Sequence, residues 1–290
     1  IPGIMEHIER AGVHSGDSIA VYPTKSLSPQ AKEKIASYTE RIALALQAQG
    51  MVNIQFVVDG DDVYIIEVNP RASRTVPFMS KVTNIPMAEL ATRVMLGEKL
   101  TESGLKPEIG DIAVKAPVFS FAKLSQVDTV LGPEMKSTGE VLGRAPVFYQ
   151  ALYKALIASG LSIPQEGTVL FTVADKDKNE ILPLAQGFYE LGYRLIATTG
   201  TAAYLNVHGI RTERVNKLFE GSPNIVDLLQ TGEIDLIINT ITKGKTPARE
   251  GFQIRRRAAE RGIPCLTSLD TATALYEALR KIQLQATPLL

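Results

Sequence analysis

The spacing of apolar residues changes along the chain near residue 163. Before that point, short β-rich runs lie between turns, and helical spacing is confined to a few stretches. After it, short apolar runs alternate regularly with stretches in which apolar residues recur every three or four positions. Strands that alternate with helices in this way predict a parallel sheet covered on both faces. The segment 163–167, Ile-Pro-Gln-Glu-Gly, is typical of a boundary, so we predict domains at 1–162 and 163–290.

The first domain is predicted to be an α+β unit rich in antiparallel hairpins. Its clearest helix begins at Ser28 and Pro29, because serine is a favourable N-cap and proline suits the first helical position. Apolar residues recur at helical spacing as far as Leu46, and Gly50 is expected to end the helix. The other expected elements are sheet at 1–27, a hairpin of strands 52–58 and 63–68, a helix at 86–96, a strand at 114–121 and a helix at 148–159.

The second domain is predicted to have a Rossmann-type α/β fold with a parallel sheet. Its expected strands are 168–174, 194–197, 234–238 and 264–266, and its expected helices are 181–191, 202–208, 225–230, 252–261 and 272–282.

The predicted hairpin contains a group of oxygen ligands. Glu67 and Asn69 are two positions apart on one strand, so their side chains share a face. Gln55 on the other strand lies opposite Glu67 if the loop is residues 60–62, whereas a two-residue loop would place it on the other face. Three oxygen ligands suit Mg²⁺, which also takes phosphate oxygens. Arg71 and Arg74 follow at once, and each can bind a phosphate or a developing anion.

Two other interpretations of the hairpin were weighed. The pattern is also typical of a polar hairpin with a solvated, charged edge. The acidic residues at 59–62 suggest a calcium loop, but the twelfth position of such a loop is Pro70, where a glutamate is required. We therefore exclude the calcium loop.

A second polar group follows two strands of the parallel sheet. Thr198, Gly200 and Thr201 lie between a strand and a helix, where N–H groups and the helix dipole favour an anion, although such a turn is often only a helix cap. Lys217 adds a cation from a later loop. Asn239 and Thr240 end another strand on the side where open α/β sheets bind ligands.

Composition excludes several classes of protein. The chain has 31 basic and 31 acidic residues, whereas a general nucleic-acid binder would have a basic excess. We expect no secretory signal, and no apolar run approaches the roughly 20 residues that span a bilayer. A single cysteine, Cys265, excludes an internal disulfide and indicates a reducing compartment, so we expect a cytoplasmic protein. The first residue, Ile1, is not methionine, so we expect a fragment.

Three stretches of the first domain resemble one enzyme family. The hairpin residues 55–58 and 65–75 resemble the metal-binding hairpin of ATP-grasp ligases, and most closely that of carbamoyl-phosphate synthase large subunits. Residues 6–18 and 131–140 resemble further stretches of the same family, in the family order. The resemblance implies a partial ATP-grasp domain that phosphorylates carbamate to carbamoyl phosphate. It also implies a glutaminase small subunit as partner, an oligomer in the full enzyme, and a role in arginine and pyrimidine synthesis.

The resemblance assigns roles to single residues. Gln55, Glu67 and Asn69 would hold Mg²⁺ or Mn²⁺ on the phosphates of ATP, and Arg71 would steady the transferred phosphoryl group. The residues that would line the nucleotide pocket are Gly12, Val13, His14 and Ser15. The lobe with the adenine pocket would precede the chain, so the isolated fragment is expected to be inactive.

The second domain resembles the methylglyoxal-synthase-like allosteric domain of the same family. The resemblance is carried by 215–217, 220–221 and 237–240. Residues 240–245 lack the catalytic aspartate of methylglyoxal synthases, which implies a sensor rather than an enzyme. A nucleoside monophosphate of the UMP type would be bound by Lys178, Thr198, Thr201, Lys217, Asn239 and Thr240.

Some members of the family also bind ornithine between the two domains. The resemblance makes Glu9, Asp17 and Thr267 candidate contacts. A further acidic contact of the family falls near Ala116, where the carboxylate is missing, which weakens this prediction for a cationic ligand.

Alternatives remain open at this point. The chain could belong to another ATP-grasp ligase, such as a biotin-dependent carboxylase, or be a nucleotide-sensing module without turnover. We expect Cys265 to fill a core, His208 to lie at a surface helix end, and the histidines to bind no metal. The run 255–257 of three arginines is expected to form a solvated helix face, although Arg255 could approach the sensor ligand.

Overall fold

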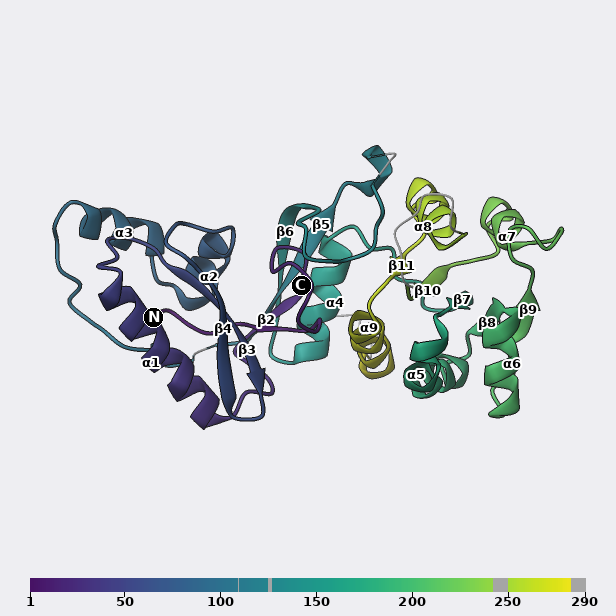
Figure 1. The fold of residues 1–290 in the computed structure, drawn as a ribbon, viewed down its shortest axis with the longest axis horizontal. Helices are drawn as coiled ribbons and strands as arrows, with labels where there is room; N and C mark the ends of the chain where they lie inside the picture. The colour runs from purple at the N-terminus through teal and green to yellow at the C-terminus, as the bar shows by residue number, and fades with distance from the viewer. Residues whose placement is uncertain (109, 125–126, 242–249, 283–290) are drawn as a thin grey trace, which may run out of the picture.

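A two-stranded hairpin, a four-stranded antiparallel sheet and a five-stranded parallel sheet follow one another along the long axis of the molecule (Figure 1). The computed structural model describes residues 1–108, 110–124, 127–241 and 250–282. The predicted fold class is confirmed, since an antiparallel α+β part precedes a parallel α/β part. Within the described ranges, no helix is long and apolar enough to cross a membrane.

The hairpin of β3 (Asn53–Asp59) and β4 (Asp62–Asn69) lies among three helices. Helix α1 (Pro29–Ala45) begins as predicted, with the Ser28 hydroxyl accepting a hydrogen bond from the amide of Ala31 at 3.0 Å. It ends before Gly50, because Gln47 takes a left-handed conformation. The two following helices are α2 (Thr75–Thr83) and α3 (Met87–Met95). Helix α2 was not predicted, since it is short and begins without a side-chain cap.

The four-stranded sheet has the order β1-β2-β5-β6, and all its pairs are antiparallel. Its strands are β1 (Glu6–His7), β2 (Ala20–Tyr22), β5 (Ile112–Phe119) and β6 (Ser137–Ala145). Helix α4 (Phe148–Ala158) packs on β5 and β6. Gly143 permits this contact, because a side chain there would lie 2.1 Å from the carbonyl oxygen of Ala151. Strand β6 was not predicted, since its two glycines and two charged residues hide the apolar alternation.

The parallel sheet has the order β11-β10-β7-β8-β9. Its strands are β7 (Thr168–Thr172), β8 (Arg194–Thr198), β9 (Glu213–Val215), β10 (Leu236–Asn239) and β11 (Cys265–Leu266). Its helices are α5 (Lys178–Glu190), α6 (Thr199–Val207), α7 (Ile225–Thr231), α8 (Glu250–Arg261) and α9 (Leu269–Lys281). Strand order reverses between β7 and β10, which is where sheets of this kind bind ligands at their carboxyl edge.

Two hydrophobic cores cover the faces of this sheet. Leu170 of β7 packs with apolar residues of α7 and α8, whereas its neighbours Val169 and Phe171 pack with residues of α5, α6 and α9. This alternation along one strand is the signature of a sheet buried on both sides. Several elements start earlier or end later than predicted: α5 begins at Lys178 and α6 at Thr199, so Thr198 is the last residue of β8.

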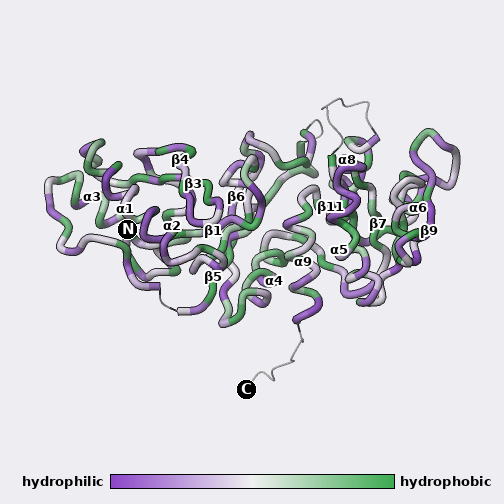
Figure 2. The backbone as a smooth tube through the Cα atoms, turned by 60° about the horizontal axis from the view of Figure 1, so that its bottom comes forward, coloured by the Kyte–Doolittle hydropathy of each residue, from purple (hydrophilic) through white to green (hydrophobic). Residues whose placement is uncertain are grey.

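Helix α4 belongs to a core that crosses the predicted domain boundary. Its residues Ala151, Leu152 and Ala155 are fully buried and share one hydrophobic cluster with β2, β5, β7 and α9. Figure 2 shows α4 and α9 close together, while α8 is largely hydrophilic. The two sheets are therefore joined by packed apolar side chains as well as by the chain.

We predict that Leu152→Ala lowers the free energy of unfolding by about 3 kcal/mol, because it leaves a cavity in the shared core. Chemical denaturation would measure the loss. Ile157→Ala on the same helix is the matched control, since Ile157 is 50% exposed and its loss should cost under about 1 kcal/mol. Equal losses for the two variants would contradict the importance of this core.

Candidate functional site

The hairpin places Gln55 opposite Glu67, but not by the predicted loop. Asp59 pairs with Asp62, so the loop has two residues and not three, and the predicted loop was wrong. A β-bulge between Gln55 and Phe56 then shifts the register by one residue, so that Gln55 pairs with Glu67 after all. The extra residue of a bulge changes which side chains share a face.

The three predicted metal ligands meet at one carboxylate oxygen. Glu67 Oε1 accepts hydrogen bonds from Gln55 Nε2 at 2.5 Å and from Asn69 Nδ2 at 2.9 Å. Gln55 Nε2 also donates to the hydroxyl of Ser15 at 2.9 Å. Because both amides turn their nitrogen toward Glu67, each would have to rotate for its oxygen to bind a metal held by the same carboxylate.

This donor set fits Mg²⁺ or Mn²⁺ in part. One carboxylate and two amide oxygens are hard ligands that such ions accept, and phosphate oxygens or water would have to complete the shell. In the described part of the chain, His, Cys, Asp and Glu side chains form no group of three or more that could hold a metal ion. A metal at Glu67 would therefore depend on a bound polyphosphate.

The two arginines after the hairpin have different surroundings. Arg71 is exposed, and its Nη1 donates to the carbonyl of Ala72 at 3.1 Å, so it does not join the cluster around Glu67. Arg74 is half-buried and donates to the Ser137 hydroxyl at 2.7 Å and to the Gly16 carbonyl at 3.3 Å. Arg74 thus fastens a loop, and its predicted contact with a phosphate stays a prediction.

That loop carries the residues predicted to line the nucleotide pocket. Ser15 reaches the Glu67 cluster through Gln55, while the Nδ1 atom of His14 accepts from the amide of Gly16 at 3.0 Å. Gly12, with a φ of 111°, and Val13 precede them on the same loop. Of the four residues, the structure brings only Ser15 into contact with a predicted metal ligand.

Two charged residues inside the protein hold this loop in place. Asp17 is fully buried, and its carboxylate accepts from the amides of Lys136 at 2.8 Å and Ser137 at 2.9 Å. Lys115 is 2% exposed and donates from Nζ to the carbonyl of Ser15 at 2.8 Å. Burial lowers the pKa of Lys115. The sequence signal for Lys115, a lysine within the apolar run of β5, was overlooked.

The three candidate ornithine contacts are already hydrogen-bonded to protein groups. Glu9 is 5% exposed and accepts from the Thr271 hydroxyl at 2.7 Å and from the Ile19 amide at 2.8 Å. Asp17 is occupied by the two amides described above, and Thr267 Oγ1 accepts from the amide of Leu131 at 3.5 Å. Ornithine binding stays a prediction and would require these bonds to rearrange.

The predicted anion site lies at the carboxyl edge of the parallel sheet. Thr198 ends β8, and Thr201 is buried in the first turn of α6. The Lys178 amine lies 3.5 Å from the point where a side chain on Gly200 would begin, next to the start of α6. A cation therefore stands beside a helix N-terminus, the arrangement that binds phosphate.

Lys217 lies near the same edge, on an exposed loop. The hydrogen bond and charge of Lys178, with a smaller effect of the charge of Lys217, hold the pKa of Asp175 below its usual value. Lys178 pairs with Asp175 at 2.7 Å. Both lysines thus act on one exposed carboxylate, which an anionic ligand would replace.

Asn239 and Thr240 are engaged by the protein itself. The hydroxyl of Thr240 accepts from the Ala174 amide at 2.9 Å, and Asn239, 2% exposed, donates to the Thr172 carbonyl at 3.3 Å. The oxygen of Asn239 accepts from Arg255 Nη1 at 2.6 Å. Residues 240–245 contain no aspartate, and most of this stretch, 242–245, lies outside the described residues.

The prediction that residues 255–257 form a solvated face is wrong for two of them. Arg255 is 5% exposed and forms an ion pair with Asp128 at 2.6 Å. Arg256 donates to the carbonyls of Phe121 at 2.8 Å and Leu124 at 2.7 Å. The sequence could not reveal these partners, because they lie more than a hundred positions away in the first domain.

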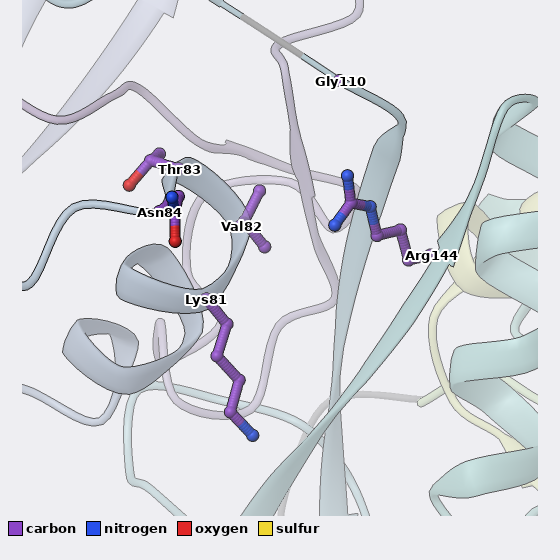
Figure 3. A pocket seen from close by; sticks show the side chains of 6 residues that line it. All are labelled: Lys81, Val82, Thr83, Asn84, Gly110 and Arg144. Carbon is purple, nitrogen blue, oxygen red and sulfur yellow. The ribbon is translucent and has the colours of Figure 1, made fainter.

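A surface pocket lies apart from both candidate sites. Its volume is about 360 Å³, and it is lined by Lys81, Val82, Thr83, Asn84, Gly110 and Arg144. Figure 3 shows Lys81 and Arg144 pointing to different sides, and Arg144 pairs with Asp111 at 3.3 Å. No predicted site residue lines this pocket, so we assign it no role in catalysis.

Cys265 packs against the core on the α7 and α8 face of the sheet, as predicted. Burial raises the pKa of its thiol to about 12, so the reactive thiolate is hardly populated at neutral pH.

Two protein-family models match separate parts of the chain. The model described as "Carbamoyl-phosphate synthase L chain, ATP binding domain" matches residues 3–103, and the model described as "MGS-like domain" matches residues 180–267. The first contains the Glu67 cluster, and the second contains most of the predicted anion site. The matches therefore agree with the fold assigned to each part.

Solved structures show more distant similarity. Methylglyoxal synthase from Elizabethkingia anophelis NUHP1 is 18% identical, with a TM-score of 0.32 over 39% of this chain and 79% of that chain. The biotin carboxylase subunit of pyruvate carboxylase is 15% identical, with a TM-score of 0.41 over 54% of this chain and 41% of that chain. The biotin carboxylase domain of Hydrogenobacter thermophilus 2-oxoglutarate carboxylase, in complex with MgADP, ADP and bicarbonate, is 16% identical, with the same coverage and TM-score. This chain spans less than half of each carboxylase chain.

The buried carboxyl of Glu9 predicts a pH-dependent stability. Burial raises its pKa from the usual 4.5 to about 7, so the folded state holds a proton that the unfolded state releases. The contribution of Glu9 to the free energy of unfolding is fully present below pH 4.5. It falls by roughly 3 kcal/mol as the pH rises to 7 and above. Denaturation of Glu9→Gln should therefore show a gain over the parent at pH 8 that shrinks at pH 5.

Comparison with the parent isolates Glu9, because every other titratable group is the same in the two proteins. Glu213→Gln is the control: the hydrogen bond from Arg194 lowers the pKa of Glu213, which therefore stays ionised from pH 5 to pH 8. A constant difference between Glu9→Gln and the parent across this range would contradict the prediction.

Proposed function

We propose that the chain is part of a glutamine-hydrolysing carbamoyl-phosphate synthase. The proposal is supported by two matches in one chain, first to the ATP-binding domain of the carbamoyl-phosphate synthase L chain and then to an MGS-like domain. The C-terminal portion of a synthase large subunit has the same order. Its ATP-grasp part is of a ligase type. The reaction assigned to it is transfer of the γ-phosphoryl group of ATP to carbamate, which yields carbamoyl phosphate and ADP.

The observation that carries the proposal is the convergence of Gln55, Asn69 and Ser15 near Glu67. Such phosphoryl transfer needs fixed positions and neutralised charge more than covalent chemistry from the protein. Mg²⁺ or Mn²⁺ would supply charge neutralisation on the ATP phosphates. Gln55, Glu67 and Asn69 would hold it through oxygen, and the hydroxyl of Ser15 orients the Gln55 amide.

Arg71 is assigned to the transferred phosphoryl group. Its guanidinium is exposed and makes one bond to a neighbouring carbonyl, so it can turn toward a phosphate at little cost. Gly12, Val13 and His14 are assigned to the nucleotide pocket because they belong to the loop that presents Ser15.

The second domain is proposed to sense a nucleoside monophosphate of the UMP type. Lys178, Gly200 and the start of α6 offer a phosphate site, and Lys217 adds charge at the same edge. Thr198, Thr201, Asn239 and Thr240 are assigned to the rest of the ligand.

Wider features of the proposal follow from the family. They are a glutaminase small subunit that supplies ammonia, an oligomeric enzyme in the cytoplasm, control by ornithine, and a place in arginine and pyrimidine synthesis. A biotin-dependent carboxylase is the weaker alternative, because the MGS-like match covers a domain that such a ligase does not require. A sensor module without turnover is the second alternative, and it predicts nucleotide binding without phosphoryl transfer.

We predict that Glu67→Gln in the assembled synthase slows formation of ATP and carbamate from ADP and carbamoyl phosphate by roughly 100-fold. The loss is expected because the cluster would lose its one carboxylate. Asp62→Asn at the exposed end of the hairpin is the control and should keep the parent rate. A Glu67→Gln enzyme with full activity would overturn the assignment.

Calorimetry would test the sensor assignment on the chain itself. We expect UMP to bind and Lys178→Ala and Lys217→Ala each to weaken binding about tenfold, because each removes a cation near the phosphate. Lys176→Ala is the matched control, since Lys176 is a neighbouring exposed lysine paired with Asp177. Loss of affinity in all three variants would indicate only a general effect of charge.

A further inference from the structure

Two adjacent arginines of α8 reach from the parallel-sheet domain into the first domain. Arg255 Nε and Nη2 donate to the two carboxylate oxygens of Asp128 at 2.7 and 2.6 Å, a bidentate contact. Arg256 donates to two carbonyl oxygens in the segment just before Asp128, as described above. Two arginines of helix α8 therefore bind one segment of the first domain, which runs from Phe121 to Asp128.

The remaining donor of Arg255 is directed to the proposed nucleotide site. Its Nη1 donates to Asn239 Oδ1 at 2.6 Å, and both residues are at least nine-tenths buried. The planar guanidinium of Arg255 thus binds Asn239 of the proposed nucleotide site and also Asp128 of the first domain. The fork geometry of arginine fixes both contacts together, which a lysine could not do.

The segment held by Arg255 continues to the loop that carries Ser15. Asp128 accepts from the amide of Val130 at 3.2 Å, and Lys136 Nζ donates to the carbonyls of Asp128 at 2.9 Å and Val130 at 2.5 Å. The amides of Lys136 and its neighbour then bind the buried carboxylate of Asp17, two residues after Ser15. Each link is a hydrogen bond between buried or half-buried groups.

The ion pair of Arg255 with Asp128 is more shielded from solvent than a surface ion pair. Burial by itself raises the pKa of Asp128, but the hydrogen bond and charge of Arg255, the amide of Val130 and the charge of Lys136 together lower that pKa, so this carboxyl is ionised at neutral pH. Arg255 is buried and Asp128 is 22% exposed, so removal of Asp128 would leave the buried charge of Arg255 without its carboxylate, which is more costly than loss of an exposed pair. Arg255 is therefore held between Asn239 on one side and Asp128 on the other.

We propose that Arg255 is a positioning residue that couples the nucleotide edge of the parallel sheet to the loop carrying Ser15 beside Glu67. The inference rests on the proposed function, since it names how the sensor acts on the ligase part. A ligand that hydrogen-bonds to the side-chain amide of Asn239 would weaken the hydrogen bond that Asn239 accepts from Arg255. Arg255 would then shift, and its contact with Asp128 would move the segment 127–137.

A chain of contacts does not by itself establish coupling, so the first experiment measures it without any ligand. Asp128→Asn keeps the shape of the side chain but removes its charge. Amide hydrogen exchange at 239–240, in the other domain, should speed up by about fivefold or more. Arg257→Lys is the matched control on α8, because no hydrogen bond or ion pair of Arg257 is found in the described part of the chain. Faster exchange at 127–137 alone would overturn the proposal.

The second experiment adds UMP to the parent and to Asp128→Asn. In the parent, UMP should slow exchange at 127–137. In Asp128→Asn, UMP should still bind, with affinity changed by less than about threefold, but the protection at 127–137 should be lost. Arg255→Lys, which keeps the charge but not the fork, should behave in the same way as Asp128→Asn.

The outcomes separate this inference from the proposed function. Binding of UMP to both proteins with unchanged protection at 127–137 would show that the coupling does not pass through Arg255. Failure of UMP to bind the parent would overturn the nucleotide assignment instead, and the ligand-free exchange at 239–240 would still decide whether Arg255 couples the two domains.

Discussion

The packing of α4 is the constraint on which the rest of the molecule depends. This helix lies against β5 and β6 and also against α9, and its buried residues join one hydrophobic core that extends from β2 to the parallel sheet. Gly143 makes the close approach possible, because any side chain there would collide with the helix backbone. With the two sheets fixed in this way, polar contacts between them keep a defined geometry, and such contacts are worth most when their partners are held in place.

The candidate ligase site is built from two such fixed parts. The hairpin provides Gln55, Glu67 and Asn69, and the loop that provides Ser15 is held by a different sheet through the buried carboxylate of Asp17. Two backbone amides satisfy this carboxylate, and the nearby charge of Lys115 also favours its ionised form, so its charge can be buried. The position of Ser15 against the Gln55 amide therefore depends on β6 and the segment before it, far from the hairpin in the sequence.

Local spacing predicted the parts of this site that depend on local geometry. The face shared by Glu67 and Asn69 follows from the period of a strand, and the start of α1 follows from Ser28. The pairing of Gln55 did not follow, because a two-residue loop with a bulge produces the same partner as a three-residue loop, and no residue type distinguishes the two. Burial of Arg255 was also beyond the sequence, since a run of three arginines reads as solvated until the fold supplies a carboxylate.

The ion pair of Lys178 with Asp175 and the ion pair of Arg255 with Asp128 differ in burial, and this difference suits them to different roles. The pair of Lys178 with the exposed Asp175 is cheap to break, so a phosphate can take the place of the carboxylate and leave the fold unchanged. In the pair of Arg255 with Asp128 the arginine is buried and the carboxylate is half-buried, so loss of the carboxylate would cost more. The proposed ligand site and the proposed coupling contact therefore differ in burial, because Lys178 faces an exposed carboxylate whereas Arg255 lies inside the protein.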